Sequence, residues 1–442
     1  MAQTRTVKIG MVGYGTVGTG VAKVLFENAD EITARTGLKL ELACVVDKDT
    51  QSARKFQIPQ KVLTDNLDAL LNDPSIEIGL ELVGGTTAAK DVQLKLLKAG
   101  KHVVTANKAL LAEHGPQLYQ AALEAGRCIA FEASCCGGIP IISALRTGLA
   151  ANRITGLYGI FNGTCNYILT NMTRRNMPFA EALKEAQARG FAEQDPSLDI
   201  SGIDTAHKLA ILAGLAFHCP IRMSDICIEG IEHIDSVDIR SALEMGYILK
   251  LLAIGEKDSE GRISLRVHPS FISENTPLAR MDGPFNAVSV FGNAVGNTMF
   301  YGRGAGMMAT ASAVVADIID IAIGNSWRLF ETMPMAVHSH SRAHIKSIED
   351  IDSRFYLRIM AKDEPGVFAQ YGQTLGKHRI SISGAIQHEW TGPDNTVPVV
   401  ITTHPTAQRN MNAALKELEQ LDIIRQKPVC IRIVDIPEDK EP

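Results

Sequence analysis

The sequence predicts an α/β protein with an N-terminal parallel sheet, a central α+β domain and a C-terminal ferredoxin-like βαββαβ domain. In the first third of the chain, apolar runs of strand length alternate with helical stretches, which is typical of right-handed βαβ units and a parallel sheet. In the last fifth, the apolar runs follow the order strand, helix, strand, strand, helix, strand. The length of 442 residues agrees with two or three domains of about 150 residues each.

The N-terminal domain is expected to span residues 1–135. Its first apolar run begins almost at the start of the chain, and helical stretches separate the later ones. The expected strands are Thr6–Gly13, Leu40–Asp47, Ile76–Gly84, His102–Ala106 and Cys128–Ser134, and the helices between them include Asp91–Ala99 and Gln117–Ala125.

The central domain is expected over residues 136–330 and mixes both types of element: helices at Phe179–Arg189 and Ala309–Ile323, and a strand at Ile263–Pro269. Residues 331–353 are polar and lack clear periodicity, so they are interpreted as a linker. The C-terminal domain, residues 354–435, has the expected elements Arg354–Ala361, Val367–Gly376, Ile380–Gln387, Val397–Thr402, Ala413–Leu421 and Val429–Val434.

Composition argues against several classes of partner. The net charge is −5 and no basic stripe marks a nucleic-acid site. No run of about 18 apolar residues predicts a membrane span, and the N-terminus has no apolar signal region. The 8 cysteines show no CxxC spacing, which favours free thiols in a reducing compartment, and hence the cytoplasm.

A glycine-rich turn follows the first expected strand. Gly13, Gly15 and Gly18 form a GxGxxG pattern between a strand and a helix, completed by Tyr14, Thr16 and Val17. The first glycine permits a tight turn, the second lets a pyrophosphate approach the backbone, and the third lets the helix pack on the strand. The helix N-terminus offers N–H groups and partial positive charge to phosphates. The pattern therefore predicts a Rossmann-type dinucleotide-binding domain, the alternative being a purely structural turn.

Residues at the carboxyl ends of the expected strands should line the ligand cleft, because ligands of open α/β sheets bind there. Gly84, Thr105 and Lys108 occupy such positions. Asp47 ends the second strand, where a carboxylate accepts hydrogen bonds from ribose hydroxyls and repels a 2′-phosphate. Asp47 therefore favours NAD, while the adjacent Lys48 offers a partner for a phosphate and leaves NADP open.

An acidic loop ending at Asp204 leads into a helical stretch that carries no charge over Leu209–Phe217. Lys208 lies four residues after Asp204, so both side chains share one helix face. A buried helix would place Lys208 at an internal pocket, where desolvation would lower its pKa and let it exchange a proton near neutrality. Two simpler interpretations stay open: a capping box of Ser201 and Asp204, and an exposed Asp204–Lys208 salt bridge.

These motifs resemble those of the homoserine dehydrogenase family, in family order, from the N-terminus to about residue 325. The C-terminal segment is similar to an ACT domain, in Arg358–Val367, Ile380–Ile382 and Gln387. The motifs that carry the family resemblance are Gly13–Gly18, Thr105–Lys108, Phe131–Ser134, Gly137–Ile142, Phe161–Tyr167, the acidic loop through Asp204 and Lys208, and Tyr301–Gly306.

The resemblance implies an oxidoreductase that interconverts homoserine and aspartate 4-semialdehyde with NAD or NADP. It implies Lys208 as the acid/base, with Lys108 also facing the substrate and Asp204 beside them. Further implied contacts are Glu193, Asp199, Gly163 and Thr164 for the substrate and Gly304 for the cofactor.

The resemblance also implies a sodium ion, a regulatory role for the C-terminal domain and a homodimer or homotetramer. ACT domains commonly bind amino acids, so feedback by an end product, threonine, is expected. The implied sodium ligands are the Glu132 side chain and the backbone carbonyls of Cys135, Gly137 and Ile139.

Three other interpretations compete with this one. One is a non-catalytic sensor that joins a nucleotide-binding fold to an amino-acid-binding domain, against which the Asp204–Lys208 pair argues. Another is a semialdehyde dehydrogenase that uses a thiol of Cys135 or Cys136, although no base is evident nearby. The third is a metal site at His338, His340 and His344, where the polar linker is the simpler interpretation.

Overall fold

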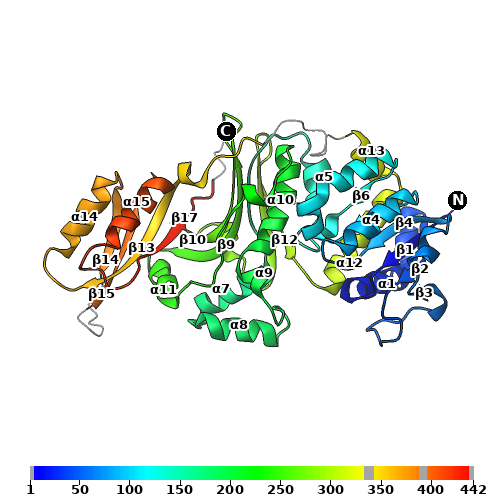
Figure 1. The fold of residues 1–442 in the computed structure, drawn as a ribbon, viewed down its shortest axis with the longest axis horizontal. Coiled ribbons are helices and arrows are strands. Elements are labelled where there is room, and N and C mark those ends of the chain that lie inside the picture. Colours follow the sequence, from blue (N-terminus) through cyan, green and yellow to red (C-terminus); the bar gives the residue numbers. More distant parts are fainter. Residues whose placement is uncertain (1–3, 333–342, 388–395, 438–442) are drawn as a thin grey trace. The chain divides into compact units, whose positions relative to one another are not determined.

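The computed structural model describes residues 4–332, 343–387 and 396–437 (Figure 1). The chain forms two compact units. Unit 1 comprises Met1–Gly163, Asp204–Ile226 and Pro284–Ala343, and unit 2 comprises Thr164–Ile203, Cys227–Gly283 and His344–Pro442. The units interleave along the chain, and the contiguous domains expected from the sequence stay a prediction.

Unit 1 contains the expected parallel sheet, whose six strands lie in the order β3-β2-β1-β4-β5-β6. The order reverses between β1 and β4, which is the switch point where open α/β sheets bind ligands. The strands are β1 (Arg5–Val12), β2 (Leu38–Val46), β3 (Leu63–Thr64), β4 (Ile76–Glu81), β5 (His102–Thr105) and β6 (Ile129–Ala130).

Helices cover this sheet, and one of them comes from far along the chain: α12 (Met307–Ala322) packs against α1 (Thr16–Glu27) (Figure 1). The central strand β1 buries Val7, Ile9 and Met11 completely. The remaining helices of this part are α2 (Ala29–Thr36), η1 (Gln60–Val62), α3 (Leu67–Leu71), α4 (Ala88–Lys98), α5 (Lys108–Glu124) and α13 (Asn325–Thr332).

Two expected elements of the N-terminal region were wrong in extent. The strand expected over Cys128–Ser134 is only β6, because the chain leaves the sheet at Phe131 and Glu132–Ser134 forms the 3₁₀ turn η2. The helix expected to begin at Gln117 begins at Lys108 and carries Pro116 within it, a residue that usually ends helices.

The rest of unit 1 is a three-stranded antiparallel sheet in the order β12-β11-β7, together with a buried helix. The helix, α10 (Ile203–Phe217), fully buries Leu209, Leu212 and Ala213, as its uncharged sequence predicts. The other elements are α6 (Ile141–Ser143), η3 (Ala144–Gly148), β7 (Ile154–Ile160), η4 (Met223–Asp225), β11 (Phe285–Gly292) and β12 (Gly296–Arg303).

The first part of unit 2 pairs two long antiparallel strands, β9 (Tyr247–Lys257) and β10 (Ile263–Ser273). The helix expected at Phe179–Arg189 is confirmed as α8 (Phe179–Ala188). The other elements that precede the C-terminal domain are α7 (Gly163–Arg175), α9 (Ser197–Ile200), β8 (Cys227–Ile228), α11 (Ser236–Glu244), η5 (Pro277–Arg280) and η6 (Ile348–Asp350).

The C-terminal βαββαβ order is confirmed, with strands in the order β17-β13-β15-β14. One buried cluster, which includes Leu357, Tyr371 and Ile401, forms its core. Strand β17 also pairs in parallel with β10, which continues the sheet within unit 2. The elements are β13 (Asp352–Lys362), α14 (Val367–Lys377), β14 (Ile382–Gln387), β15 (Thr396–Thr403), β16 (Thr406–Ala407), α15 (Gln408–Leu418) and β17 (Val429–Ile433).

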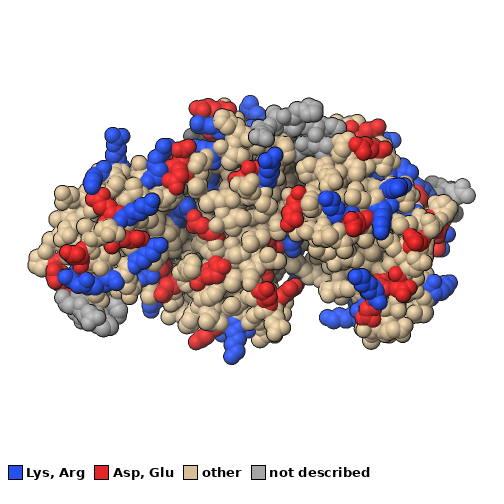
Figure 2. Space-filling model, in the orientation of Figure 1, with Lys and Arg blue, Asp and Glu red and all other residues tan. Residues whose placement is uncertain are grey.

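The described surface agrees with the composition. Lys and Arg side chains are interspersed with Asp and Glu over the face shown in Figure 2. Among the described helices, none is by itself long and apolar enough to cross a membrane; α12 and α13 meet that criterion only as a pair bent by 80°.

Candidate active site

The glycine turn has the backbone that its pattern predicts. Gly13 has φ +101°, and a side chain at Gly18 would bring its Cβ within 2.2 Å of the Gly13 carbonyl oxygen. Gly15, the N-cap residue of α1, has nothing within 4 Å of its Cβ position, so its surface is open to a ligand. Tyr14, Thr16 and Val17 complete the turn, and the N–H groups at the start of α1 are available for phosphates.

Asp47 lies beside this turn, immediately after β2, and its carboxylate has partners within the protein. Its Oδ2 accepts a hydrogen bond from the Tyr14 N–H at 2.5 Å. Arg54 has one guanidinium nitrogen 3.6 Å from Asp47 Oδ1 and lies over the Tyr14 ring. Arg54 could not be identified from the sequence, because a contact that closes across an irregular loop leaves no periodic signal.

A buried glutamate organises the carboxyl ends of β4 and β5. Glu81 accepts hydrogen bonds from the N–H of Gly84 and, at 2.7 Å, from the Thr105 hydroxyl. Asn107 donates to the Gly85 carbonyl and caps α5 through Leu110 N–H. The Glu81 bonds join two of the expected cofactor positions, Gly84 and Thr105, and the third, Lys108, is the first residue of the helix that Asn107 caps.

The carboxylate of Asp204 contacts two lysines, Lys208 on the same helix and Lys108 at the start of α5. Asp204 Oδ2 lies 2.7 Å from Lys208 Nζ, and Oδ1 lies 2.9 Å from Lys108 Nζ. The Lys208 side chain is 9% exposed and that of Asp204 8%, whereas Lys108 is 41% exposed. The exposed-salt-bridge interpretation is therefore wrong, because the 204–208 pair is buried. The capping box is also wrong, because the Ser201 hydroxyl has no partner in the described chain and Asp204 binds lysines.

Two asparagines to which the sequence analysis assigned no role hold this arrangement. Asn162 donates to Asp204 Oδ2 at 2.8 Å, and Asn286 donates to the Phe161 carbonyl at 2.9 Å. That carbonyl accepts a second bond, at 2.7 Å, from Lys208 Nζ. Gly304 lies against Asn286, and a Cβ there would come within 1.9 Å of the Asn286 side chain. Gly304 therefore keeps Asn286 in place, whatever it contributes to a cofactor.

The charges around Lys208 reverse the expected direction of its pKa shift. Burial is the largest single influence on the pKa of Lys208 and lowers it, but the Asp204 carboxylate, with smaller help from Cys136 and Cys135, outweighs burial. The resulting pKa lies above the ordinary lysine value, not below it. Burial raises the pKa of Asp204, yet Lys208 and Lys108 together hold it well below its usual range. Asp204 is thus ionised and Lys208 is an ammonium group near neutrality.

Cys135 and Cys136 are fully buried next to the cluster and are poor nucleophiles. Burial raises the pKa of both thiols, that of Cys136 to about 11. A thiol nucleophile needs a lowered pKa and access to substrate. The thiol-dependent alternative is therefore not supported by this environment.

The expected sodium ligands share one loop of unit 1. Glu132 is 4% exposed and its carboxylate accepts bonds from Ile142 N–H, Ser143 N–H and the Ser143 hydroxyl. Burial raises its pKa despite these bonds. The carbonyl of Ile139 accepts the N–H of Ile141. Cys135 and Gly137 lie in the same buried loop.

The other expected substrate contacts fall mostly in unit 2. Glu193 is exposed and Asp199 half-buried in α9, while the Thr164 hydroxyl donates to the Phe191 carbonyl at 2.6 Å. Gly163 belongs to unit 1, where a Cβ would meet the Pro284 carbonyl at 2.8 Å. The expected substrate contacts are thus divided between the two units.

The histidine metal site, an alternative to the polar linker, falls only partly within the described residues. His338 and His340 lie outside the described residues, and the His344 carbonyl accepts a bond from Ile263 N–H. Within the described ranges, no three His, Cys, Asp or Glu side chains gather in a way that could hold a metal ion.

Unit 1 combines a dinucleotide-binding sheet with a buried lysine–aspartate ion pair, Lys208 with Asp204. A nicotinamide cofactor carries hydride, and the protein must supply a proton donor or acceptor for the oxygen of the substrate. A glycine turn for the pyrophosphate and a lysine held by an aspartate meet both needs. The fold and this site define the class of nicotinamide-dependent dehydrogenases.

Comparison with known proteins gives the family. The family profile "Homoserine dehydrogenase" matches residues 140–319, and "Homoserine dehydrogenase, NAD binding domain" matches residues 13–132. A homoserine dehydrogenase of Neisseria gonorrhoeae is 43% identical over 97% of this chain and 99% of its own length. The chain belongs to the homoserine dehydrogenase family, and is an oxidoreductase with an NAD-binding domain.

Solved structures agree with this assignment. The crystal structure of a homoserine dehydrogenase from Thiobacillus denitrificans has a TM-score of 0.88 at 39% identity and covers 98% of this chain and 99% of that one. A hyperthermophilic archaeal homoserine dehydrogenase, solved in complex with NADPH, has a TM-score of 0.60 at 26% identity and covers 72% of this chain and 98% of that one.

Proposed function

We propose that this chain interconverts homoserine and aspartate 4-semialdehyde, with Lys208 as the acid/base. One observation supports this role above the others: the Lys208 ammonium group is buried and fixed between Asp204 and the Phe161 carbonyl, in the same unit as the glycine turn. A sensor without catalysis would have no need of a buried proton donor with two fixed partners.

Because its pKa is raised, Lys208 is an ammonium group at rest near neutrality. When the aldehyde is reduced, the Lys208 ammonium group donates a proton to the oxygen that becomes the homoserine hydroxyl. When homoserine is oxidised, Lys208 must first lose its proton and then accept that of the hydroxyl. Lys108, more exposed and bound to the other oxygen of Asp204, orients the substrate or polarises its oxygen. The bound nicotinamide supplies or takes up the hydride.

The substrate ammonium is assigned to Glu193, with Asp199, Gly163 and Thr164 nearby. This part of the proposal rests on the family resemblance. The exposed carboxylate of Glu193 and the ordered start of α7 agree with it.

NAD is proposed as the preferred cofactor, with NADP accepted less well. The Asp47 carboxylate repels a 2′-phosphate, while Arg54 beside it offers that phosphate a partner. We expect Arg54→Ala to raise KM for NADP by about tenfold or more and to change KM for NAD little. Homoserine-dependent formation of NADH and NADPH, measured side by side, checks this. Equal losses with both cofactors would show that Arg54 only supports the turn, and an exposed Arg35→Ala variant serves as the control.

Sodium is included in the proposal as a structural ion only. A hard cation takes oxygen ligands, and the loop offers Glu132 with the carbonyls of Cys135, Gly137 and Ile139. The three donors that reach the Glu132 carboxylate leave about one of its roughly four lone-pair positions free. We assign no proton transfer to this ion.

The C-terminal βαββαβ domain is proposed to act as an ACT-type regulatory domain that binds threonine. The proposed assembly is a homodimer or homotetramer, and the proposed compartment is the cytoplasm, which suits the eight free cysteines. The domain is coupled to the rest of unit 2 by the β17–β10 pairing and by the ion pair of Arg358 with the buried Asp238.

Deleting residues from 351 onward is expected to abolish inhibition by threonine while uninhibited turnover persists. Regulation needs an effector that binds two states with different affinity, and the deletion removes the domain that would bind it. Initial rates with and without threonine measure this, with thermal unfolding as a check on folding. Inhibition that survives the deletion would move the effector site elsewhere, and a full-length chain insensitive to threonine would refute the effector assignment.

A further inference from the structure

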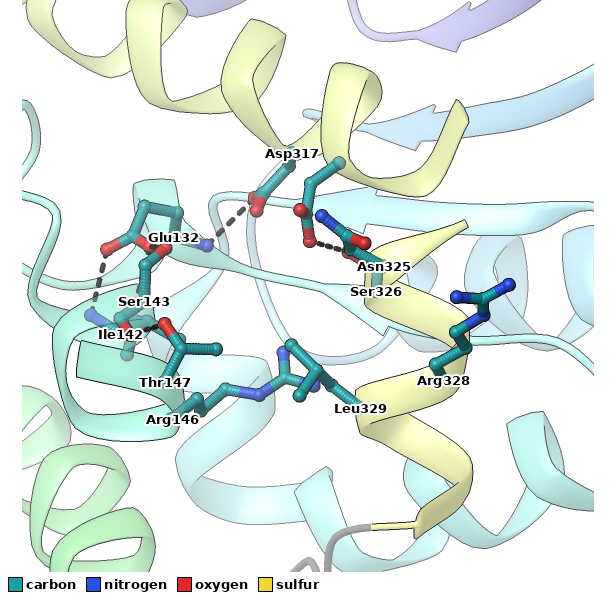
Figure 3. Close-up of a pocket in the computed structure, with 11 residues that line it drawn as sticks. Glu132, Ile142, Ser143, Arg146, Thr147, Asp317, Asn325, Ser326, Arg328 and Leu329 are labelled. Carbon is teal, nitrogen blue, oxygen red and sulfur yellow. Dashed lines mark hydrogen bonds between the residues drawn. The ribbon is translucent and has the colours of Figure 1, made fainter. Parts of the chain in front are cut away.

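A polar cavity of about 500 Å³ opens in unit 1 between η3 and the helices α12 and α13 (Figure 3). Most of the side chains in its wall are polar or charged, and they carry both signs. Arg146 and Arg328 contribute guanidinium groups, and Glu132, Asp317 and Asp320 contribute carboxyl groups. The cluster of lysines around Asp204 does not belong to this wall.

Arg146 is the unusual member of the wall. The residue is 9% exposed, and its side chain reaches across the cavity, with the guanidinium group beside Leu329 (Figure 3). Within the described chain, its Nε and Nη2 atoms are buried and have no hydrogen-bond partner. Guanidinium groups are almost always paired when they leave water, because an unpaired buried charge is strongly unfavourable.

The carboxyl groups that could pair with Arg146 are engaged with other donors. Glu132 accepts bonds from α6, and Asp317 accepts the Glu132 N–H at 2.8 Å. Asp320 accepts the hydroxyl of Ser326 at 2.5 Å. Arg146 attracts Glu132 and Asp317 electrostatically, but within the described chain no carboxyl group accepts a hydrogen bond from its Nε or Nη2, as expected where a ligand completes the pairing.

We propose that this cavity binds a free α-amino acid. The ligand carboxylate pairs with the guanidinium of Arg146, and the ligand ammonium donates to the carboxyl groups of Asp317 and Asp320. A planar guanidinium matches a carboxylate with two parallel hydrogen bonds. A simple anion would face three carboxyl groups, and a simple cation would leave Arg146 unpaired, so a zwitterion suits this wall best.

Thermal unfolding of the full chain with each of the twenty L-amino acids tests the proposal. At least one other than threonine, for which the C-terminal domain is also a proposed site, is expected to raise Tm, as any ligand of the folded state does. For a positive amino acid, the analogues that lack either the ammonium or the carboxylate should fail; for L-serine these are 3-hydroxypropionate and ethanolamine. No shift with any amino acid other than threonine, or equal shifts with the analogues, would overturn the proposal.

Arg146→Met separates a ligand site from a structural role. Without ligand, the variant is expected to have a Tm equal to or above that of the parent, because methionine fills the space and removes a buried guanidinium group whose N–H groups have no acceptor. It should also lose the amino-acid shift. A lower Tm with the shift retained would show that Arg146 only supports the fold. If the variant does not fold, Arg328→Gln at the exposed rim should weaken the shift, while Arg35→Gln on α2 leaves it unchanged.

Discussion

Replacement of Lys208 by methionine is expected to lower kcat in both directions by about 10²–10⁴-fold, the usual contribution of a positioned acid/base. Methionine preserves the apolar stem and the packing of α10, and removes only the ammonium group. Cofactor binding, followed by the quenching of NADH fluorescence, should be nearly unchanged, because the glycine turn does not depend on residue 208.

Lys208→Arg and Lys101→Met complete this test. Arginine retains the positive charge but does not release a proton, so Lys208→Arg should be almost as impaired as Lys208→Met. Lys101 is also buried in unit 1, but it binds the carbonyls of Asp73 and Ile76 at the amino ends of the strands, so its replacement should leave kcat near normal. Near-normal kcat in Lys208→Met would leave the proposed chemistry without its acid/base.

The parts of this site that are local in sequence could be predicted. The spacing of its glycines predicts the GxGxxG turn between β1 and α1. The four-residue separation of Asp204 and Lys208 puts both side chains on one face of α10. The burial of that face follows from the uncharged stretch after Lys208. Each inference uses residues within one or two turns of each other, where geometry is fixed by the secondary structure.

The parts that depend on long-range packing could not be predicted. Asn162 follows β7 and Asn286 lies in β11. Asn162 falls within the Phe161–Tyr167 motif, but nothing local in the sequence links its side chain to Asp204, and Asn286 stands in none of the motifs. The sign of the Lys208 pKa shift was also missed, because burial and ion pairing oppose each other and only the 2.7 Å contact decides between them. Similarly, the sequence does not predict that α5 starts at Lys108, because Pro116 lies within the helix and proline usually ends one.

Asp204→Asn is expected to move the pH dependence of turnover to lower pH. Burial, the largest single influence on the pKa of Lys208, lowers it, and Asp204 is the main group that raises it. Without the carboxylate, burial dominates, and the pKa should fall by about one to three units, the usual effect of an opposite charge at this distance. Homoserine oxidation requires deprotonated Lys208, so its rate should rise with pH through a lower midpoint. Aldehyde reduction requires the ammonium form, and should lose about tenfold for each unit by which the pKa falls below the assay pH.

A matched control exists in unit 2, where the buried Lys250 lies 3.3 Å from Asp282. Burial lowers the pKa of Lys250 to about 8 although Asp282 opposes the shift, so this pair also holds a desolvated lysine. Asp282→Asn should leave the pH–rate midpoint where it is, because Lys250 has no role in the proposed proton transfer. A midpoint that moves equally in both variants would mean that the profile reports the general charge of the protein. A midpoint unmoved in Asp204→Asn would mean that Lys208 is not the group whose ionisation controls the rate.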